Sequence, residues 1–327
     1  MIKSTLPKKI LYWYDNNKRS LPWRKKLSQV KREYYTLVSE FMLQQTQVVT
    51  VVPYFNNFIK DIPNASSLAK INEQKLLKYW EGLGYYSRVR NLKKTAQILV
   101  KNFKGRLPST IEELKLLPGI GDYTANAIMA IGFNKPFIPL DGNIERVIKR
   151  LLNLKLFSEV SKENLVIEKK ILGTSVRARD YAQALMELGA LICRPKNPLC
   201  RQCPLIKNCI SFKNNDFEIT KERKKKIDKS YLLKVYKKNN QFLLIKNTKF
   251  NFLKNLKIFP MNEMTKNDNL KKDLNFKISN INMNIIIQFS RTKESIPNSS
   301  WIDSSKLDSY TLPTFTKKIF SYLEKNK

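Results

Sequence analysis

Histidine is absent from this chain of 327 residues. Its absence excludes serine–histidine triads, histidine general bases and histidine metal ligands. Acid–base chemistry must therefore fall to carboxylates, lysine, tyrosine or cysteine. Long apolar runs are also missing, since nothing approaches the ~18–20 residues of a membrane span and the N-terminus has no uninterrupted apolar signal core. We therefore expect a cytoplasmic protein with no membrane association.

Acidic residues are scarce relative to basic ones. The chain holds 27 Asp+Glu against 61 Lys+Arg, a formal net charge of +34, with a pI of about 10.0. A protein this basic suits a polyanionic partner, above all nucleic acid. A genome biased toward lysine, asparagine and isoleucine is the alternative explanation. The length and the 42% hydrophobic content predict two domains with real cores.

The first part of the chain, 1–212, predicts a helical domain. Apolar residues recur there at helical spacing, and proline and glycine separate the segments. The predicted helical segments are 34–52, 66–80, 89–102, 111–117, 122–132, 143–153 and 178–192. The polar, highly charged stretch 213–229 then predicts a linker.

The remaining residues, 230–327, predict a smaller α+β domain. "YLLKVYKKNNQFLLIKN" holds two apolar runs around a Lys-Asn turn, which is typical of a hairpin. "FKISNINMNIIIQFS" predicts a second pair of strands, and "TLPTFTKKIFSYLEK" predicts a closing helix. The expected fold class is therefore mainly helical, with a smaller α+β C-terminal domain.

Cysteine is rare, and all four copies lie within "CRPKNPLCRQCPLIKNC", with the spacing C-x6-C-x2-C-x5-C. A cytoplasmic chain would not use them as disulfides, so we expect them to converge on one centre. Structural zinc sites usually pair two short knuckles, whereas these longer loops suit the larger span of a [4Fe–4S] cube. We predict an iron–sulfur cluster, with zinc as the alternative, on Cys193, Cys200, Cys203 and Cys209.

A glycine-containing turn joins two helical runs in "STIEELKLLPGIGDYTANAIMAI". Ser109 and Glu112 fit a capping box at the first helix start. Gly119 and Gly121 flank Ile120 before the second helix. Two positions without side chains at a helix start let backbone N–H groups approach an anion. The pattern predicts a helix–hairpin–helix motif that binds phosphate and makes no contact with the bases. The alternative is a simple turn between two helices with no binding role.

Two carboxylates are candidates for catalysis. Glu40 lies in the apolar stretch "LVSEFMLQQTQV", and no basic residue lies within four positions of it. An exposed helical glutamate often has such a partner, so Glu40 is unusual. Asp141 follows an apolar segment and precedes a helix in "FIPLDGNIERVIKRLL". An N-cap is the ordinary role for an aspartate in that position.

With these features together, the chain resembles the helix–hairpin–helix DNA glycosylases that carry an iron–sulfur cluster, and within them the MutY family of adenine glycosylases. The resemblance covers nearly the whole chain, in the family's order. It rests on the cysteine spacing and on the segments "LPWR", "SEFMLQQTQV", "WEGLGYYSRVRNL", "LPGIGDYTANAI", "LDGNIERV" and "YAQALMELGALIC".

The resemblance implies removal of adenine mispaired with 8-oxoguanine or guanine in double-stranded DNA, by a monomer that flips the base out of the duplex. Glu40 would be the general acid that protonates the leaving base. Its apolar neighbours should favour the neutral carboxyl. Asp141 would stabilise the oxocarbenium ion, in the two-carboxylate logic of glycoside hydrolysis.

The resemblance also assigns individual residues. Endonuclease III-like enzymes have a Schiff-base lysine where this chain has Tyr123, so it implies a monofunctional glycosylase in which Tyr123 organises the adenine pocket with Asp141. Gln45 and Tyr85 would enter the base stack. Asn143 would lie near the extruded sugar. The pocket or the nucleic acid would be contacted by Arg24, Arg88 and Gln183.

The C-terminal domain resembles the Nudix-like module of the same family, which reads 8-oxoguanine, but it has no acidic Nudix catalytic box. In "QFSRT", Phe289 would insert its ring into the base stack, and Ser290 would form a hydrogen bond with the oxidised base. Arg291 stands where the family commonly has histidine, and this puts lesion discrimination in question.

Three other readings compete. The first is an endonuclease III-like pyrimidine glycosylase, against which Tyr123 and the second domain argue. The second is a non-catalytic, cluster-bearing DNA-binding protein, which would not need Glu40 and Asp141 together. The third is a basic RNA-binding protein, which would lack the glycine hairpin.

Overall fold

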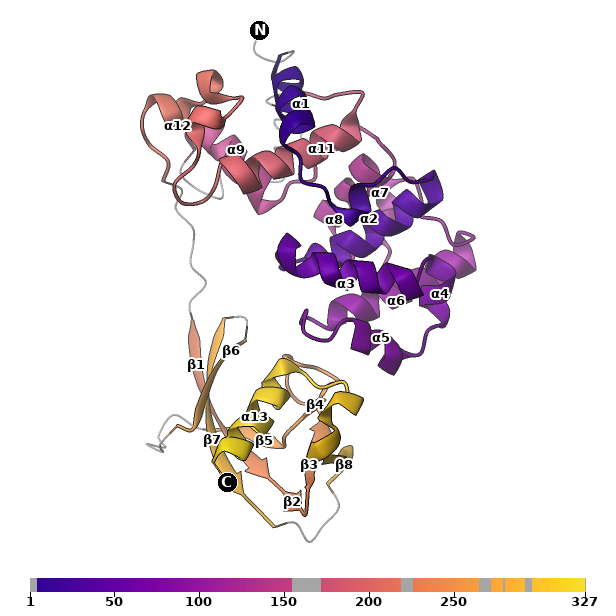
Figure 1. The fold of residues 1–327 in the computed structure, drawn as a ribbon, viewed down its shortest axis with the longest axis vertical. Helices are drawn as coiled ribbons and strands as arrows, with labels where there is room; N and C mark the ends of the chain where they lie inside the picture. The colour runs from indigo at the N-terminus through magenta and orange to yellow at the C-terminus, as the bar shows by residue number, and fades with distance from the viewer. Residues whose placement is uncertain are drawn as a thin grey trace. The chain divides into compact units, whose positions relative to one another are not determined.

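The structure is a computed structural model and describes residues 5–154, 172–218, 226–264, 272–278, 280–291 and 296–326. It forms two compact units, which are described separately below (Figure 1). One unit comprises Met1–Ile71 and Arg90–Glu222, and the other comprises Asn72–Val89 and Arg223–Lys327. Among the described residues, no helix is long and apolar enough to cross a membrane.

Helices dominate the described part of the chain up to Lys213, as the sequence predicts. They are α1 (Leu6–Asn17), α2 (Gln29–Leu43), α3 (Val48–Asp61), α4 (Ala65–Lys70), α5 (Glu73–Tyr79), α6 (Ser87–Asn102), α7 (Ile111–Lys115), α8 (Asp122–Ala127), α9 (Gly142–Leu152), α11 (Ala178–Glu187) and α12 (Ile210–Lys213). Two of them continue as π-helical turns: α8 into η2 (Ile128–Gly132) and α11 into η5 (Leu188–Ile192).

Three details of the helix prediction are wrong. The segment 34–52 is two helices, because the chain turns after Leu43 and Gln45 takes a positive φ of 57°. The segment 66–80 also divides, into α4 and α5. The helix start near 110 is capped by Thr110 rather than Ser109. The Thr110 hydroxyl accepts from the backbone N–H of Glu113 at 3.4 Å and donates to its carboxylate at 2.7 Å.

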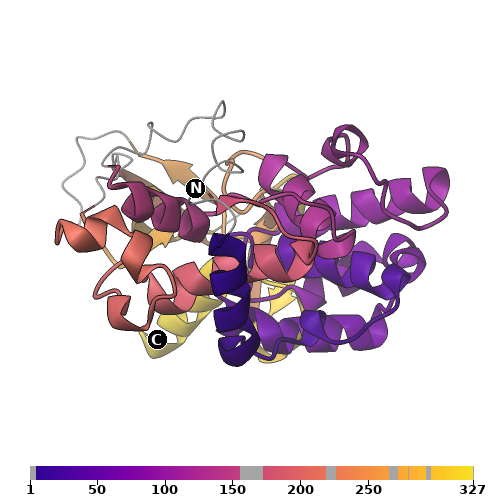
Figure 2. The same cartoon turned by 90° about the horizontal axis from the view of Figure 1, so that it is seen from above.

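One core of the helical unit lies where α1, α9 and α11 meet. Figures 1 and 2 show α1 lying against α11. Ile10 of α1, Ile148 of α9 and Leu185 of α11 are at most 1% exposed in this core. Cys193, Cys203 and Cys209 pack against its edge. The cysteine loop is therefore attached to the same core that holds α9.

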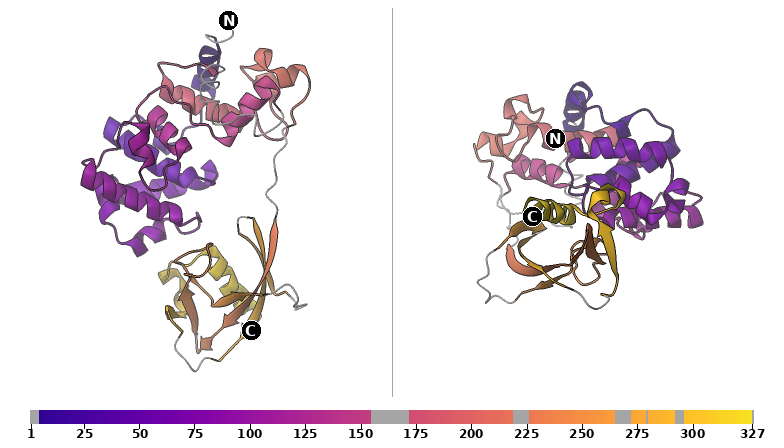
Figure 3. Two further views of the ribbon diagram at one scale, coloured as in Figure 1. Left: turned by 180° about the vertical axis from the view of Figure 1, so that it is seen from behind. Right: turned by 60° about the horizontal axis from the view of Figure 1, so that its bottom comes forward.

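The second unit contains two sheets. The strands are β1 (Ile227–Val235), β2 (Lys237–Lys238), β3 (Gln241–Lys246), β4 (Lys257–Ile258), β5 (Met261–Glu263), β6 (Leu274–Ile278), β7 (Ile281–Phe289) and β8 (Ser299–Asp303). One sheet has the order β5-β1-β7-β6, and the other has β2-β3-β4 with β8 beside β3. The closing helix α13 (Thr314–Lys325) packs on these strands (Figure 3), and its Phe320 meets Phe242 at a centroid distance of 5.3 Å.

The strand predictions are partly confirmed. β6 and β7 form the expected antiparallel pair, with Ile278 opposite Ile281. The first hairpin is shorter than predicted, because only β2 pairs with β3 across the Lys-Asn turn. β1 belongs to the other sheet, where it runs parallel to β7. Of the predicted linker, 219–225 lies outside the described residues.

Candidate active site

Glu40 is buried on α2 and makes no ion pair with a described residue. Glu40 is 4% exposed, and its Oε2 has no hydrogen-bond partner among the described residues. Burial raises the pKa of its carboxyl to about 7. A hydrogen bond from Tyr123 and the charge of Arg24 lower this pKa, while the charge of Asp141 raises it. Glu40 is therefore a carboxyl that can hold a proton near neutral pH.

Tyr123 is the hydrogen-bond donor to Glu40. It lies in the first turn of α8, directly after the glycine turn. Burial raises the pKa of its hydroxyl well above 10, and the charges of Glu40 and Asp141 add to this effect. The hydroxyl therefore stays protonated and acts as a donor. The partly buried ring of Tyr123 packs against a cluster that includes Ala127 and Ala130.

Asp141 is the N-cap of α9, as its position in the sequence suggests. Its Oδ1 accepts from the backbone N–H groups of Asn143 at 3.0 Å and Ile144 at 2.7 Å. Its Oδ2 accepts from the side-chain amide of Asn143 at 2.8 Å. These three bonds fix the carboxylate relative to α9, so a capping role and a catalytic role are compatible.

Arg146 connects this cap to the cysteine loop. Its Nη2 donates to Asn143 Oδ1 at 2.8 Å and to the carbonyl of Gly189 at 2.7 Å. Its Nε donates to the carbonyl of Cys193 at 2.7 Å. Gly189 permits the approach, since an added Cβ would lie 2.6 Å from the Cβ of Asn143. The position of Asp141 thus depends on contacts with η5 and with the first cysteine.

Glu187 and Arg19 belong to the same region but were not predicted. Glu187 is fully buried and accepts from Arg24 Nη1 at 2.8 Å and from Arg19 Nε at 2.9 Å. Burial alone would raise the pKa of Glu187, but the two guanidinium groups outweigh burial and lower it. Gln183 lies one turn earlier on α11, is 4% exposed and donates to the carbonyl of Arg179. The predicted residues Arg24 and Gln183 thus share this region with an ion cluster.

The two hairpin glycines differ in what surrounds them. Gly119 has φ +83°, and an added Cβ would lie 2.8 Å from the ring of Phe41. Gly121 has an ordinary φ of −97°, and an added Cβ would meet nothing within 4 Å. The protein itself therefore requires glycine at 119, whereas position 121 is open.

Both predicted intercalating residues are exposed and have left-handed backbone. Gln45 has φ +57°, and Tyr85 has φ +47° and is 51% exposed. Such conformations cost about 1 kcal/mol or more for a residue other than glycine, and they are often found at functional sites. Arg88 is buried, and its Nη2 donates to the carbonyls of Leu83 and Gly84, both at 3.1 Å. It therefore supports the turn that carries Tyr85.

The four cysteines lie together around the end of α9. Arg150 Nη1 lies 3.6 Å from the sulfur of Cys193, and the sulfur of Cys209 lies 3.3 Å from the carbonyl of Arg150. Burial raises the pKa of Cys203 to about 12, and the other three cysteines add to the increase. Within the described residues, no three cysteine or acidic side chains are arranged to ligate a single ion.

In the second unit, the predicted lesion-reading residues end β7. Phe289 is 64% exposed, and the backbone N–H of Ser290 donates to the carbonyl of Val235 at 2.9 Å. Arg291 is exposed beyond them. The aromatic ring is therefore available to an external partner, while the backbone behind it is held by β1.

Comparison with known proteins places these features in a family. Residues 38–169 match the model of the HhH-GPD superfamily base excision DNA repair protein. The Adenine DNA glycosylase of Buchnera aphidicola subsp. Baizongia pistaciae is 35% identical over 344 residues, covering 97% of this chain and 96% of that protein. The chain belongs to the adenine DNA glycosylase family. The Homo sapiens Adenine DNA glycosylase is 41% identical over 207 residues, covering 61% of this chain and 38% of that protein.

Solved structures match the fold of the helical part of the chain. A thermostable thymine-DNA glycosylase matches with a TM-score of 0.57 at 26% identity, covering 64% of this chain and 95% of that one. A trapped endonuclease III–DNA covalent intermediate matches with a TM-score of 0.53 at 21% identity, which shows the fold alone. The expected helix–hairpin–helix glycosylase fold is confirmed.

Proposed function

We propose that this protein hydrolyses the N-glycosidic bond of adenine in mispaired duplex DNA, as a monofunctional base-excision-repair enzyme. The observation that carries the proposal is Glu40: a buried carboxyl that makes no ion pair with a described residue, is hydrogen-bonded by Tyr123 and lies within the electrostatic influence of Asp141 and Arg24. A general acid must be protonated at working pH, and a pKa of about 7 satisfies this requirement. We infer that the excised base is adenine from the names of the relatives, which are adenine DNA glycosylases.

The reaction follows from these groups. Glu40 donates its proton to a ring nitrogen of the flipped base, and the glycosidic electron pair leaves with the base. The sugar becomes an oxocarbenium ion, which the negative charge of Asp141 stabilises. Water adds to the sugar carbon and returns a proton to Glu40. Asn143 and the α9 amides hold Asp141 in place, so it need not reorganise during the reaction.

The spacing of the four cysteines supports a [4Fe–4S] cluster rather than zinc. Structural zinc sites usually pair two short knuckles, whereas only one of the three cysteine spacings in C-x6-C-x2-C-x5-C is that short. A cube spreads its ligands over four irons and tolerates wider spacing. Cys193, Cys200, Cys203 and Cys209 would hold it, and the cluster would supply a rigid loop with Arg194 and Lys196 near DNA phosphates. Arg146 would couple this loop to the cap of α9, because its Nε donates to the carbonyl of Cys193 at 2.7 Å.

We also propose that residues 230–327, joined through the linker 213–229 to the glycosylase domain 1–212, recognise 8-oxoguanine opposite the adenine. The support is the resemblance to the Nudix-like module, with exposed Phe289 beside Ser290. Gln45 and Tyr85 would enter the base stack, and the open position Gly121 would let backbone N–H groups reach a phosphate.

Single-turnover excision tests the function. Duplexes would hold one adenine opposite 8-oxoguanine, guanine or thymine, and half of each sample would be heated in alkali. We expect strand breaks only after alkali, fastest opposite 8-oxoguanine, and at least a 1,000-fold loss in Glu40→Gln. Glu33→Gln is the matched control, because Glu33 is buried on the same helix but paired with Arg106.

Each alternative outcome has a distinct meaning. Breaks without alkali would reveal a lyase and reject the monofunctional assignment. Loss of activity in Glu33→Gln as large as in Glu40→Gln, with both variants folded, would remove Glu40 as the specific acid. No product with any adenine duplex would reject the proposed substrate, although the fold assignment would stand.

A further inference from the structure

A hollow of about 450 Å³ in the helical unit holds more positive charge than the proposed chemistry uses. Seven of its lining residues are lysine or arginine, and in the described part of the chain Asp180 is the one acidic lining residue. Glu40, Asp141 and Tyr123 do not line it, whereas Arg24 and Gln183, which the resemblance assigns to the pocket or the nucleic acid, do. Adenine is neutral, so a wall of this charge needs another explanation.

Three of the seven cations have carboxylate partners. Arg19 and Arg24 both contact Glu187 at 2.8 Å, and Lys18 lies 3.9 Å from Asp15. Asp180 does not compensate the others directly, because its carboxylate pairs with Arg177 at 2.7 Å. The remaining four, Lys25, Lys26, Arg32 and Arg179, make no ion pair with a described residue.

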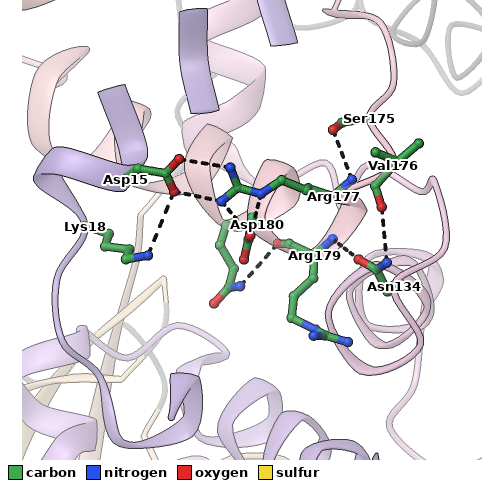
Figure 4. A network of polar contacts seen from close by, with 9 residues as sticks. Asp15, Lys18, Asn134, Ser175, Val176, Arg177, Arg179 and Asp180 are labelled. Atoms are coloured by element: carbon green, nitrogen blue, oxygen red, sulfur yellow. Dashed lines mark hydrogen bonds and ion pairs between the residues drawn. The ribbon is translucent and has the colours of Figure 1, made fainter. Parts of the chain in front are cut away.

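Arg32 and Arg179 are held in place by groups that do not neutralise them. Arg179 Nε donates to the carbonyl of Ile131 at 2.7 Å. Arg32 donates to the carbonyl of Leu27 at 2.7 Å and to Gln29 Oε1 at 3.1 Å. Figure 4 shows the guanidinium of Arg179 pointing away from Asp15 and Asp180. Both keep N–H groups free for a ligand, because a guanidinium carries five donors.

The two guanidinium groups also repel each other. Burial is the largest cause that lowers the pKa of Arg179, and the positive charge of Arg32 is the next. The charge of Asp180 offsets part of this effect on Arg179, but Asp180 is already paired with Arg177, so a bound anion would stabilise the two cations further. The planar forks suit phosphate oxygens, which accept paired hydrogen bonds.

We propose that this hollow binds a phosphate group, held by Arg32 and Arg179. Lys25 and Lys26 add positive charge around it, while Trp23 and Gln183 line the same space and suit a base and sugar. The volume accommodates a mononucleotide. The phosphate comes either from a free nucleotide or from the backbone of a DNA strand, and the second source rests on the proposed function.

Calorimetric titration of the full chain without DNA tests free ligands. Adenosine monophosphate, adenosine and inorganic phosphate would be titrated at constant ionic strength, so that non-specific charge effects cancel. We expect the monophosphate to bind at least tenfold more tightly than adenosine. Arg32→Gln and Arg179→Gln should each remove most of this preference, and Arg179→Lys should restore part of it.

Lys31→Gln is the matched control. Lys31 neighbours Arg32 on α2, is exposed and does not line the hollow. Its replacement removes the same charge and should change the affinity for the monophosphate less than twofold. An equal effect in Lys31→Gln and Arg32→Gln would show that only net charge matters and would overturn the site.

Duplex DNA distinguishes the second source. If the monophosphate binds no better than adenosine, but Arg32→Gln and Arg179→Gln weaken duplex binding at least fivefold more than Lys31→Gln does, the phosphate belongs to DNA. No selective effect on either ligand overturns the proposal. Adenine excision by the unmodified protein is measured in parallel: its absence, with the phosphate preference intact, would reject the proposed function and leave this site standing.

Discussion

At the scale of single residues, two glutamates with the same local sequence pattern have opposite environments. Glu40 and Glu187 both lie in apolar helical stretches without a basic residue within four positions. Arg19 and Arg24 reach Glu187 from 168 and 163 residues away and lower its pKa. Glu40 has no ion-pair partner in the part of the chain that the structure describes, and burial raises its pKa. The isolation of Glu40 was predictable from sequence, whereas Glu187 was missed because its partners are distant.

The raised pKa of Glu40 predicts a specific pH dependence of excision. The acid must be protonated, so the single-turnover rate constant should be constant below about pH 6. It should fall tenfold per pH unit above the pKa of about 7. Quenched-flow measurements between pH 5 and pH 9, with enzyme in excess over duplex, would check this. A rate constant that rises or stays level up to pH 9 would show that Glu40 is not the proton donor.

The same carboxyl should also affect stability. Its folded pKa lies above the usual 4.5, so its favourable contribution is fully present below pH 4.5 and is lost as pH rises through about 7. Glu40→Gln cannot ionise and should therefore lose less stability than the unmodified protein between pH 5 and pH 8. Urea unfolding of both proteins at pH 5 and pH 8 would measure this difference. The same data would show whether a loss of excision rate at high pH comes from unfolding.

At the scale of elements, the sequence predicts helices better than their ends or partners. The periodic pattern found α6, α9 and α11 because each has one buried face. It merged α2 with α3, since apolar spacing continues across Gln45 and only the backbone reverses there. Strand pairing was harder, because β1 pairs with β7, which lies about fifty residues further along the chain. Local turn signals cannot reveal such a pairing.

The glycine hairpin predicts different results for its two glycines. Gly119→Ala would force a side chain into positive φ and against Phe41, so we expect a loss of roughly 2 kcal/mol or more in the free energy of unfolding. Gly121→Ala has space and ordinary φ, so stability should change by less than about 0.5 kcal/mol. Its Cβ would stand between the backbone and a phosphate, so duplex affinity should fall about tenfold.

Urea unfolding and fluorescence anisotropy with labelled duplex separate these effects. Gly121→Ala serves as the folded control for the hairpin. If Gly121→Ala binds duplex as tightly as the unmodified protein, this turn does not contact DNA. A stable Gly119→Ala variant would show that Phe41 can move aside.

At the scale of the whole molecule, the formal charge of +34 has two explanations that sequence alone does not separate. Compositional bias scatters lysines over the surface without regard to a ligand. A DNA-binding surface places cations where they contact phosphates and release counterions. The salt dependence of binding distinguishes the two, because its slope depends on the number of phosphates contacted and not on the net charge of the chain.

We therefore predict a steep salt dependence for duplex binding. Contacts with 6–10 phosphates would reduce affinity about 10³–10⁵-fold between 50 mM and 200 mM salt. Anisotropy titrations would use Glu40→Gln with an adenine–8-oxoguanine duplex, so that binding is measured without excision. The excision rate constant of the unmodified enzyme, measured at saturation, should change little over the same range, because the buried site is poorly screened. A slope of log affinity against log salt near −1 would mean that most of the excess charge does not contact DNA, and the composition would then reflect bias alone.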